Sequence, residues 1–246
     1  TNPASQPPRV VLLQRANALV SSAQTMERSM LDTLSGINTN ITDGAQKVNM
    51  LAANIADLNQ RISQQESGGD RATALDLRDQ RGQKLDELAK LVDFSTIEDT
   101  NGSVTITVGM RNLVYGATTN QMSSKTNAEG NKDLYLDGIN ITGSIRMGQL
   151  SGLIAARDDI QSIALTGLRK LVGSITQQVN AQHRSGFGLD VSTGNDFFTP
   201  LQLSTTSNAA GANVTATLTD PDLLTLDEYR IPVDAANNTI ITKKQT

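Results

Sequence analysis

The residue best suited to chemistry is the single histidine, His183, which stands in the run Asn180-Ala181-Gln182-His183-Arg184. An imidazole can exchange a proton near neutral pH, but a catalytic base needs a partnered nucleophile, and no sequence signature supplies one. The position of His183 near the end of a predicted helix favours another role, because a histidine there can bond to the terminal carbonyl groups or complement the helix dipole. We therefore expect His183 to be structural.

Two glycine-containing segments follow the histidine, and each contains residue types that are found in ligand sites. The run 190–196, Asp-Val-Ser-Thr-Gly-Asn-Asp, mixes oxygen ligands with glycine as calcium loops do, but it lacks the twelve-residue alternation and the closing Glu of an EF-hand. Gly186-Phe187-Gly188 is too short for a dinucleotide fingerprint and follows a predicted helix, where that fingerprint would follow a strand. The sequence therefore predicts no catalytic residue, no metal site and no cofactor.

Charged residues between 76 and 87 are spaced for ion pairs along one helix. The runs Asp76–Arg81 and Lys84–Glu87 place opposite charges three and four residues apart. Such pairs are typical of a solvated helix face and contribute about 0.2–0.5 kcal/mol each. We therefore expect this segment to lie on the surface. Because none of these residue patterns is typical of a catalytic site, we do not expect the chain to be an enzyme.

The composition excludes several classes of protein. The chain has 246 residues and no cysteine, which rules out a disulfide framework and a thiolate zinc site. Its net charge is −4, the wrong sign for wholesale phosphate neutralisation, so nucleic acid is not an expected partner. No apolar stretch approaches the ~18 residues that span a bilayer, so membrane insertion is not expected either.

Apolar residues recur every three or four positions from Pro8 to about Gln65, which predicts one long amphipathic helix. Gly36 and Gly44 lower helix propensity, so a bend or break near 36–44 is compatible with the sequence. The stripe must be buried either between neighbouring subunits or in the chain's own core, and both alternatives stay open. The candidate helix-packing residues are Leu34, Ile41, Val48, Ile55, Leu58 and Ile62.

Two further helices and a small sheet are predicted after the first helix. Ser67-Gly68-Gly69 ends the first helix, and Asp70 caps a second over about 72–92 that runs back along it. Asn101-Gly102 before Val104–Val108 predicts a tight hairpin, with further strands at 113–115, 134–136 and 139–146 and a polar loop over 118–132. A third helix, capped by Ser151, is expected to run to about Gly186.

The expected architecture is α+β: an elongated antiparallel helical bundle with a small inserted β-sheet, followed by part of a β-rich outer domain. We place the helical rod domain at 1–200, with inserted hairpins at about 93–147, and the cut-off start of the outer domain at 201–246. A hairpin is predicted there between Tyr229–Val233 and Thr239–Thr242. The absence of an initiator Met suggests an excised interior segment.

Three segments, in order, resemble the flagellar hook-associated protein 1 family, FlgK. They are Val48–Ile62, with its Ile-Ala-Asp-Leu-Asn-Gln-Arg-Ile; Leu75-Asp-Leu-Arg-Asp-Gln80; and Asn180-Ala-Gln-His-Arg-Ser-Gly-Phe187 leading to Gly194-Asn-Asp-Phe-Phe198. Leu77, Arg81 and Val179 depart from the family pattern as changes in packing. The family-like positions are Leu75, Asp76, Arg78, Asp79, Asn180, His183, Gly186, Asp196, Phe197 and Phe198.

The resemblance implies a structural, non-catalytic junction protein, exported through the flagellar secretion apparatus, that joins hook to filament outside the cell. The implied partners are copies of itself in a ring, the hook protein and the second junction protein. The family's terminal axial segments have no counterpart here, so we expect this fragment to be monomeric in solution. Another flagellar axial protein, a surface-binding adhesin or a peptidoglycan hydrolase stays open at this stage.

Overall fold

A computed structural model describes residues 6–68, 71–200, 229–230 and 242–243. The predicted Asp70 cap and nearly all of the predicted outer domain at 201–246 lie outside these residues. Within that domain only β8 (Tyr229–Arg230) and β9 (Thr242–Lys243) are described, and they pair antiparallel. The boundary at residue 200 therefore stays a prediction.

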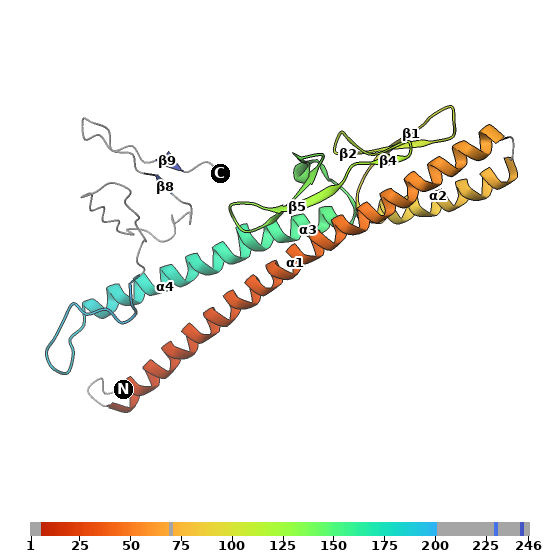
Figure 1. The fold of residues 1–246 in the computed structure, drawn as a ribbon. Helices are drawn as coiled ribbons and strands as arrows, with labels where there is room; N and C mark the ends of the chain where they lie inside the picture. The colour runs from red at the N-terminus through yellow and green to blue at the C-terminus, as the bar shows by residue number, and fades with distance from the viewer. Residues whose placement is uncertain (1–5, 69–70, 201–228, 231–241, 244–246) are drawn as a thin grey trace, which may run out of the picture. The chain divides into compact units, whose positions relative to one another are not determined.

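The long helices are confirmed and begin and end close to their predicted limits (Figure 1). Helix α1 (Gln6–Gly68) is continuous through residues 36–44, and α2 is Arg71–Leu91. The predicted third helix is divided into α3 (Gly148–Asp159), the π-helical segment η2 (Ile160–Leu165) and α4 (Thr166–Arg184). The predicted Ser151 cap is wrong, because α3 begins three residues earlier and Met147 occupies its N-cap position.

The inserted β region forms two antiparallel sheets where one was predicted. The first has the order β1-β2-β3-β4 and the second β5-β6-β7. The Asn101-Gly102 hairpin is confirmed, with Gly102 at φ +78° between β1 and β2. The predicted loop over 118–132 is corrected, since it contains β4 and β5, and the predicted strand 139–146 shortens to β7 followed by a 3₁₀ turn. The bounds are β1 Ser95–Glu98, β2 Val104–Val108, β3 Arg111–Tyr115, β4 Thr118–Thr119, β5 Met122–Thr126, β6 Lys132–Leu136, β7 Ile139–Asn140 and η1 Thr142–Ser144.

The chain divides into two compact units, and α1 runs through both. Unit 1 comprises Thr1–Leu31 and Gln161–Thr246, and unit 2 comprises Asp32–Ile160. In unit 1, Glu27 pairs with Arg169 near the start of α4, while Leu12 lines the same cavity as Gln182 near its end. The first part of α1 and α4 are therefore antiparallel. Together with the antiparallel sheets of unit 2, this confirms the expected α+β class.

Unit 2 holds the main hydrophobic core. The apolar stripe of α1 packs there with Leu88 and Val92 at the end of α2, with inward side chains of both sheets and with Leu150 of α3. A Cβ at Gly44 would lie 2.6 Å from Leu150 Cδ2, so a glycine permits the close approach of α1 to this leucine. Burying an Ile or Leu side chain contributes roughly 1.5–3 kcal/mol. The six predicted packing residues, Leu34, Ile41, Val48, Ile55, Leu58 and Ile62, are all buried inside unit 2.

Amide side chains on α1 bind the backbone of both sheets. Asn49 donates to the carbonyl of Met122 and accepts its N–H, both at 2.8 Å, so it pairs with β5 as a strand would. Asn59 donates to the carbonyls of Val104 and Gly116 and accepts the N–H of Val104 at 3.0 Å. Because these bonds satisfy strand groups that face a helix, they fix how each sheet sits on α1.

Two glycines of α3 should respond oppositely to substitution. Gly148 has φ +86°, and an added Cβ would lie 2.7 Å from the carbonyl group of Leu91, whereas nothing lies within 4 Å at helical Gly152. Gly148→Ala should lower the free energy of unfolding by more than about 1 kcal/mol, and Gly152→Ala should raise it by up to about 1 kcal/mol. Urea unfolding followed by circular dichroism checks both, and equal effects would contradict this account.

Asn59 should be the most costly asparagine of α1 to remove. Asn59→Ala leaves the strand carbonyl and N–H of Val104, the turn carbonyl of Gly116 and the buried Arg81 guanidinium without this partner, so unfolding free energy should fall by about 2–4 kcal/mol. Asn54→Ala is the matched control, because Asn54 is exposed on the same helix and Ala is the better helix former. Similar urea midpoints for the two variants would show that the Asn59 bonds contribute little.

Candidate functional site

The family-like residues from 180 to 198 come together at the end of α4 in unit 1. Asn180 is buried, and its Oδ1 accepts the N–H groups of Phe197 and Phe198 at 3.0 and 2.8 Å. Its Nδ2 donates to the carbonyl of Phe198 at 2.8 Å. One amide side chain thus folds the returning segment back onto the helix.

His183 anchors the same segment. Its Nδ1 lies 2.8 Å from the carbonyl oxygen of Asn195, and its ring lies 5.5 Å from that of Phe197, which in turn meets Phe198 edge-on at 4.9 Å. Its partner differs from the predicted one, since His183 bonds to a loop carbonyl and not to the last turn of its helix.

The end of α4 is capped by the loop. Thr193 Oγ1 donates to the carbonyls of Arg184 and Gly186, and the N–H of Gly194 also reaches the carbonyl of Arg184. The Arg184 side chain pairs with Asp196 at 2.7 Å. These contacts satisfy carbonyl groups that a helix end otherwise leaves free.

The run 190–196 resembles a calcium loop in composition, but its contacts do not have the geometry of one. Asp190 Oδ1 accepts the hydroxyl of Ser192 at 2.6 Å and its N–H at 3.1 Å, and these bonds lower the pKa of Asp190. Asp196 is engaged by Arg184. Among the residues that the structure describes, no three His, Cys, Asp or Glu side chains are placed to hold a metal ion. The loop is an Asx turn that holds its own backbone.

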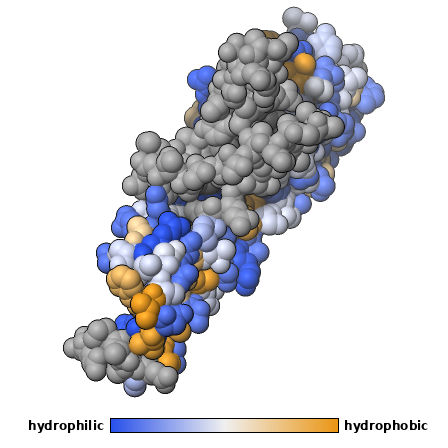
Figure 2. Space-filling model, turned by 90° about the vertical axis from the view of Figure 1, so that its left-hand side faces the viewer, coloured by the Kyte–Doolittle hydropathy of each residue, from blue (hydrophilic) through white to orange (hydrophobic). Residues whose placement is uncertain are grey.

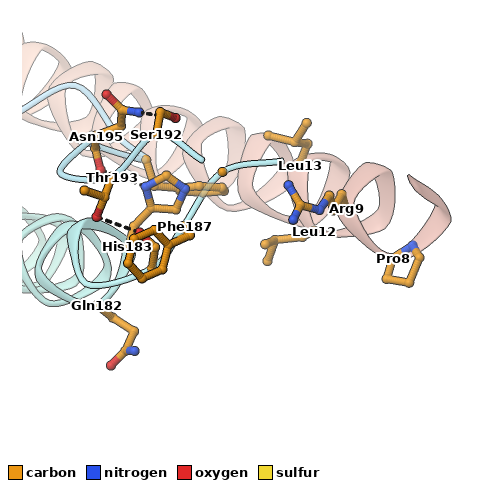
Figure 3. Close-up of a pocket in the computed structure, with 13 residues that line it drawn as sticks. Pro8, Arg9, Leu12, Leu13, Gln182, His183, Phe187, Ser192, Thr193 and Asn195 are labelled. Carbon is orange, nitrogen blue, oxygen red and sulfur yellow. Dashed lines mark hydrogen bonds between the residues drawn. The ribbon is translucent and has the colours of Figure 1, made fainter. Parts of the chain in front are cut away.

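A cavity of about 600 Å³ lies between this loop and the first turns of α1 (Figure 3). Its lining is mainly apolar and includes Leu12 and Leu13 of α1 and Phe187 and Phe197 of the returning segment. Among the described residues, His183 Nδ1 is bonded to the carbonyl oxygen of Asn195 and not to a nucleophile. The cavity is therefore suited to accept apolar side chains.

The described helices of unit 1 leave many apolar side chains in solvent, and Figure 2 shows hydrophobic surface gathered at the lower end of its view. On α1 only Ala16, Ala23, Glu27 and Met30 are partly covered between residues 7 and 31. Leu12, Leu19 and Met26, which recur every seven residues, are 45–55% exposed. The exposed large apolar residues of unit 1 are Val10, Val11, Leu12, Leu13, Leu19, Val20, Met26, Leu31, Ile163, Leu171, Val172, Phe187, Leu189 and Val191.

The second group of family-like residues lies on α2 in unit 2. Arg78 binds Glu66 of α1, with Nε at 2.8 Å, and Glu98 of β1, and the bond to Glu66 raises the pKa of Arg78. The sequence spacing had suggested partners on the same helix, but Arg78 binds residues of two other elements. Asp76 accepts the amide of Gln80, whereas Leu75 and Asp79 are exposed. The predicted Lys84–Glu87 pair is confirmed at 2.8 Å.

Sequence reasoning missed the role of Arg81. Its side chain is buried, donates to Asn59 Oδ1 at 2.9 Å and to the carbonyl of Gly102 at 2.6 Å, and lies 3.5 Å from Glu98. Burial lowers the pKa of Arg81, and the Glu98 carboxylate opposes that change. The sequence feature that could have identified Arg81 is its position four residues after Leu77, which places it on the buried face of α2.

Asn180→Ala tests whether one amide holds the returning segment. The backbone amides of Phe197 and Phe198 should exchange hydrogen about tenfold faster or more, because a hydrogen bond to a buried partner contributes about 1–3 kcal/mol. Gln178→Ala is the control, since Gln178 is exposed on the same helix and bonds to Ser174. Unchanged exchange in Asn180→Ala would contradict the anchoring role.

Comparison with known proteins gives consistent matches. The model of the flagellar hook-associated protein FlgK helical domain matches residues 1–198. The chain is 28% identical to Flagellar hook-associated protein 1 of Escherichia coli (strain K12) over 240 residues, and to that of Salmonella typhimurium (strain LT2) over 244 residues. These matches cover 92% and 93% of this chain but 44% of each relative, so the chain spans less than half the length of the relatives it matches.

The fold is also found in a solved structure, that of the flagellar hook junction protein FlgK from Burkholderia pseudomallei. The TM-score is 0.76 at 20% identity, over 100% of this chain and 48% of that one. None of the helices in the described part of the chain is long and apolar enough to cross a membrane. With a family model matched over residues 1–198 and this fold, the chain belongs to the family of the flagellar hook-associated protein FlgK, whose helical domain it contains.

Proposed function

We propose that the protein is a structural subunit of the hook–filament junction of the bacterial flagellum, outside the cell, and that it works without catalysis. The observation that carries this proposal is the exposed apolar surface of unit 1 in a chain of this family. Because α1 and α4 leave so many Leu, Val and Met side chains in water, we expect further helices to pack on both of their sides.

The proposed partners are copies of this protein in a ring, the hook protein and the second junction protein. The six candidate helix-packing residues are not available for such contacts, because they are buried in unit 2 of their own chain. We therefore assign subunit packing to the exposed face of α1 between residues 10 and 31. Residues 201–246 would begin the outer domain, and the isolated chain would be monomeric when dilute.

Leu19→Glu and Met26→Glu test this assignment in the protein that contains this chain. Both side chains are largely exposed, so unfolding free energy should change by no more than about 0.5 kcal/mol. In cells lacking the native junction protein, each variant should fail to hold filaments on the hook, because a charge on a packed helix face is costly. Swimming and the amount of filament released into the medium are the measurements.

Asn17→Glu is the control on the same helix, because Asn17 is an exposed polar residue. It should complement like the unsubstituted protein. Filaments that detach even with the unsubstituted protein would overturn the proposed function. Filaments that stay attached with Leu19→Glu and Met26→Glu would instead place the assembly surface elsewhere.

A further inference from the structure

The turn between β1 and β2 contains the one place in the sequence where an asparagine precedes a glycine, Asn101-Gly102. The amide carbon Cγ of an asparagine side chain can be attacked by the backbone nitrogen of the next residue, which closes a succinimide ring. Glycine hinders this attack least, because it has no Cβ beside the nitrogen. This dipeptide is therefore the position in the chain with the highest intrinsic tendency to deamidate.

The reaction is hydrolytic, and water is its co-reactant. The Gly102 nitrogen gives its proton to solvent base and bonds to Asn101 Cγ, while the Cγ–Nδ2 bond breaks and Nδ2 leaves as ammonia with a proton taken from water. Water then opens the ring. Cleavage of the bond from nitrogen to Cγ gives aspartate, whereas cleavage of the bond from nitrogen to the backbone carbonyl gives isoaspartate, whose main chain is longer by a methylene.

The folded turn engages both reacting groups in other bonds. The N–H of Gly102 donates to the carbonyl of Asp99 at 3.0 Å, and Asn101 Oδ1 accepts the N–H of Ser103 at 3.1 Å. To react, the Gly102 nitrogen must lose its proton and face Cγ of Asn101, which breaks its bond to Asp99. The reaction therefore proceeds from an open form of the turn, and its rate follows the population of that form.

Arg81 of α2 holds the other side of Gly102. Its side chain is buried, and Nη1 donates to the Gly102 carbonyl at 2.6 Å. Gly102 is itself buried, and a Cβ built on it would lie 2.6 Å from Glu66 Oε2 and 2.8 Å from Arg78 Nη2. Opening the turn would take the carbonyl away from a buried guanidinium, which is costly because a buried charged donor then loses an acceptor. Arg81 thus keeps the population of the open turn low.

We infer that Asn101 is a site of spontaneous deamidation and that Arg81 sets the rate of the reaction by holding the Gly102 carbonyl. Arg81 is a positioning residue, since its bond is to this carbonyl and not to the attacking nitrogen. The inference concerns the chemistry of one turn within unit 2. It goes beyond the proposed function and does not depend on it.

Peptide mapping by mass spectrometry tests the site in the protein that contains this chain, incubated in mildly alkaline buffer with and without urea. In urea, Asn101 should convert about tenfold faster, or more, than Asn140, which precedes the β-branched Ile141. Asn101 of the folded protein should convert about tenfold more slowly, or less, than in urea, because the turn is then closed. Equal rates at Asn101 and Asn140 in urea would overturn the assignment of the site.

Arg81→Met tests the positioning role in buffer without urea, where it should speed deamidation of Asn101 about tenfold. Leu150→Ala is the control for a general loss of stability, because Leu150 is fully buried in the same unit and packs at Gly44, about 33 Å along α1 from Glu66. Equal acceleration in the two variants would show that global unfolding sets the rate and would overturn the role of Arg81. If Arg81→Met does not fold by circular dichroism, Arg81→Lys takes its place, with a smaller acceleration expected.

The isoaspartate product tests the same bond from the other side. The pairing of Glu98 with Val104 and the bond from Arg81 to Gly102 both depend on the length of the main chain in the turn. The isoaspartate chain should therefore unfold at a lower urea concentration than Asn101→Asp, which carries the same charge without the extra methylene. Equal urea midpoints would contradict the hold of Arg81 on this turn.

Discussion

The structure depends on hydrogen bonds that side-chain amides on helices make to the backbone of strands and loops. Asn49 and Asn59 hold one sheet each on α1, and Asn180 holds the returning segment on α4. In each case one amide supplies both a donor and an acceptor, so backbone groups that face a helix find partners without a neighbouring strand. Small sheets of short strands can then be attached to long helices, although so small a sheet is marginal by itself.

A charged side chain is buried in these interfaces only where several partners bind it. Arg81 lies within the α2 interface and is shared by Asn59, Gly102 and Glu98, while Arg78 binds Glu66 and Glu98 nearer the surface. Removing an ion from water costs several kcal/mol, which only such multiple bonds offset. The abundance of Asn, Thr and Ser in this chain thus has a structural use, since uncharged groups bind backbone without that cost.

The helices and the first hairpin could be predicted because their signals are local. The three- and four-residue period of α1 runs through Gly36 and Gly44, and buried contacts on that stripe outweigh their weak helix propensity. Strand β5 was missed because Met122 is its only buried side chain, and its place is set by pairing with β6 and Asn49. The π-helical segment was missed because Ile160–Leu165 keeps a helical period, and Arg81 because its partners are distant in sequence.

The two units differ in how completely they satisfy their own residues. In unit 2 every helix stripe meets another element of the chain, and charged residues such as Arg157 bind backbone carbonyls as well as carboxylates. The described helices of unit 1 bury only Leu165, Gly173 and Asn180, and their heptad-spaced leucines remain exposed. A segment with strong helical periodicity and little burial is stabilised mainly by what packs on it from outside. Unit 2 thus buries its own helix stripes, whereas the described helices of unit 1 leave apolar area that further packing can bury.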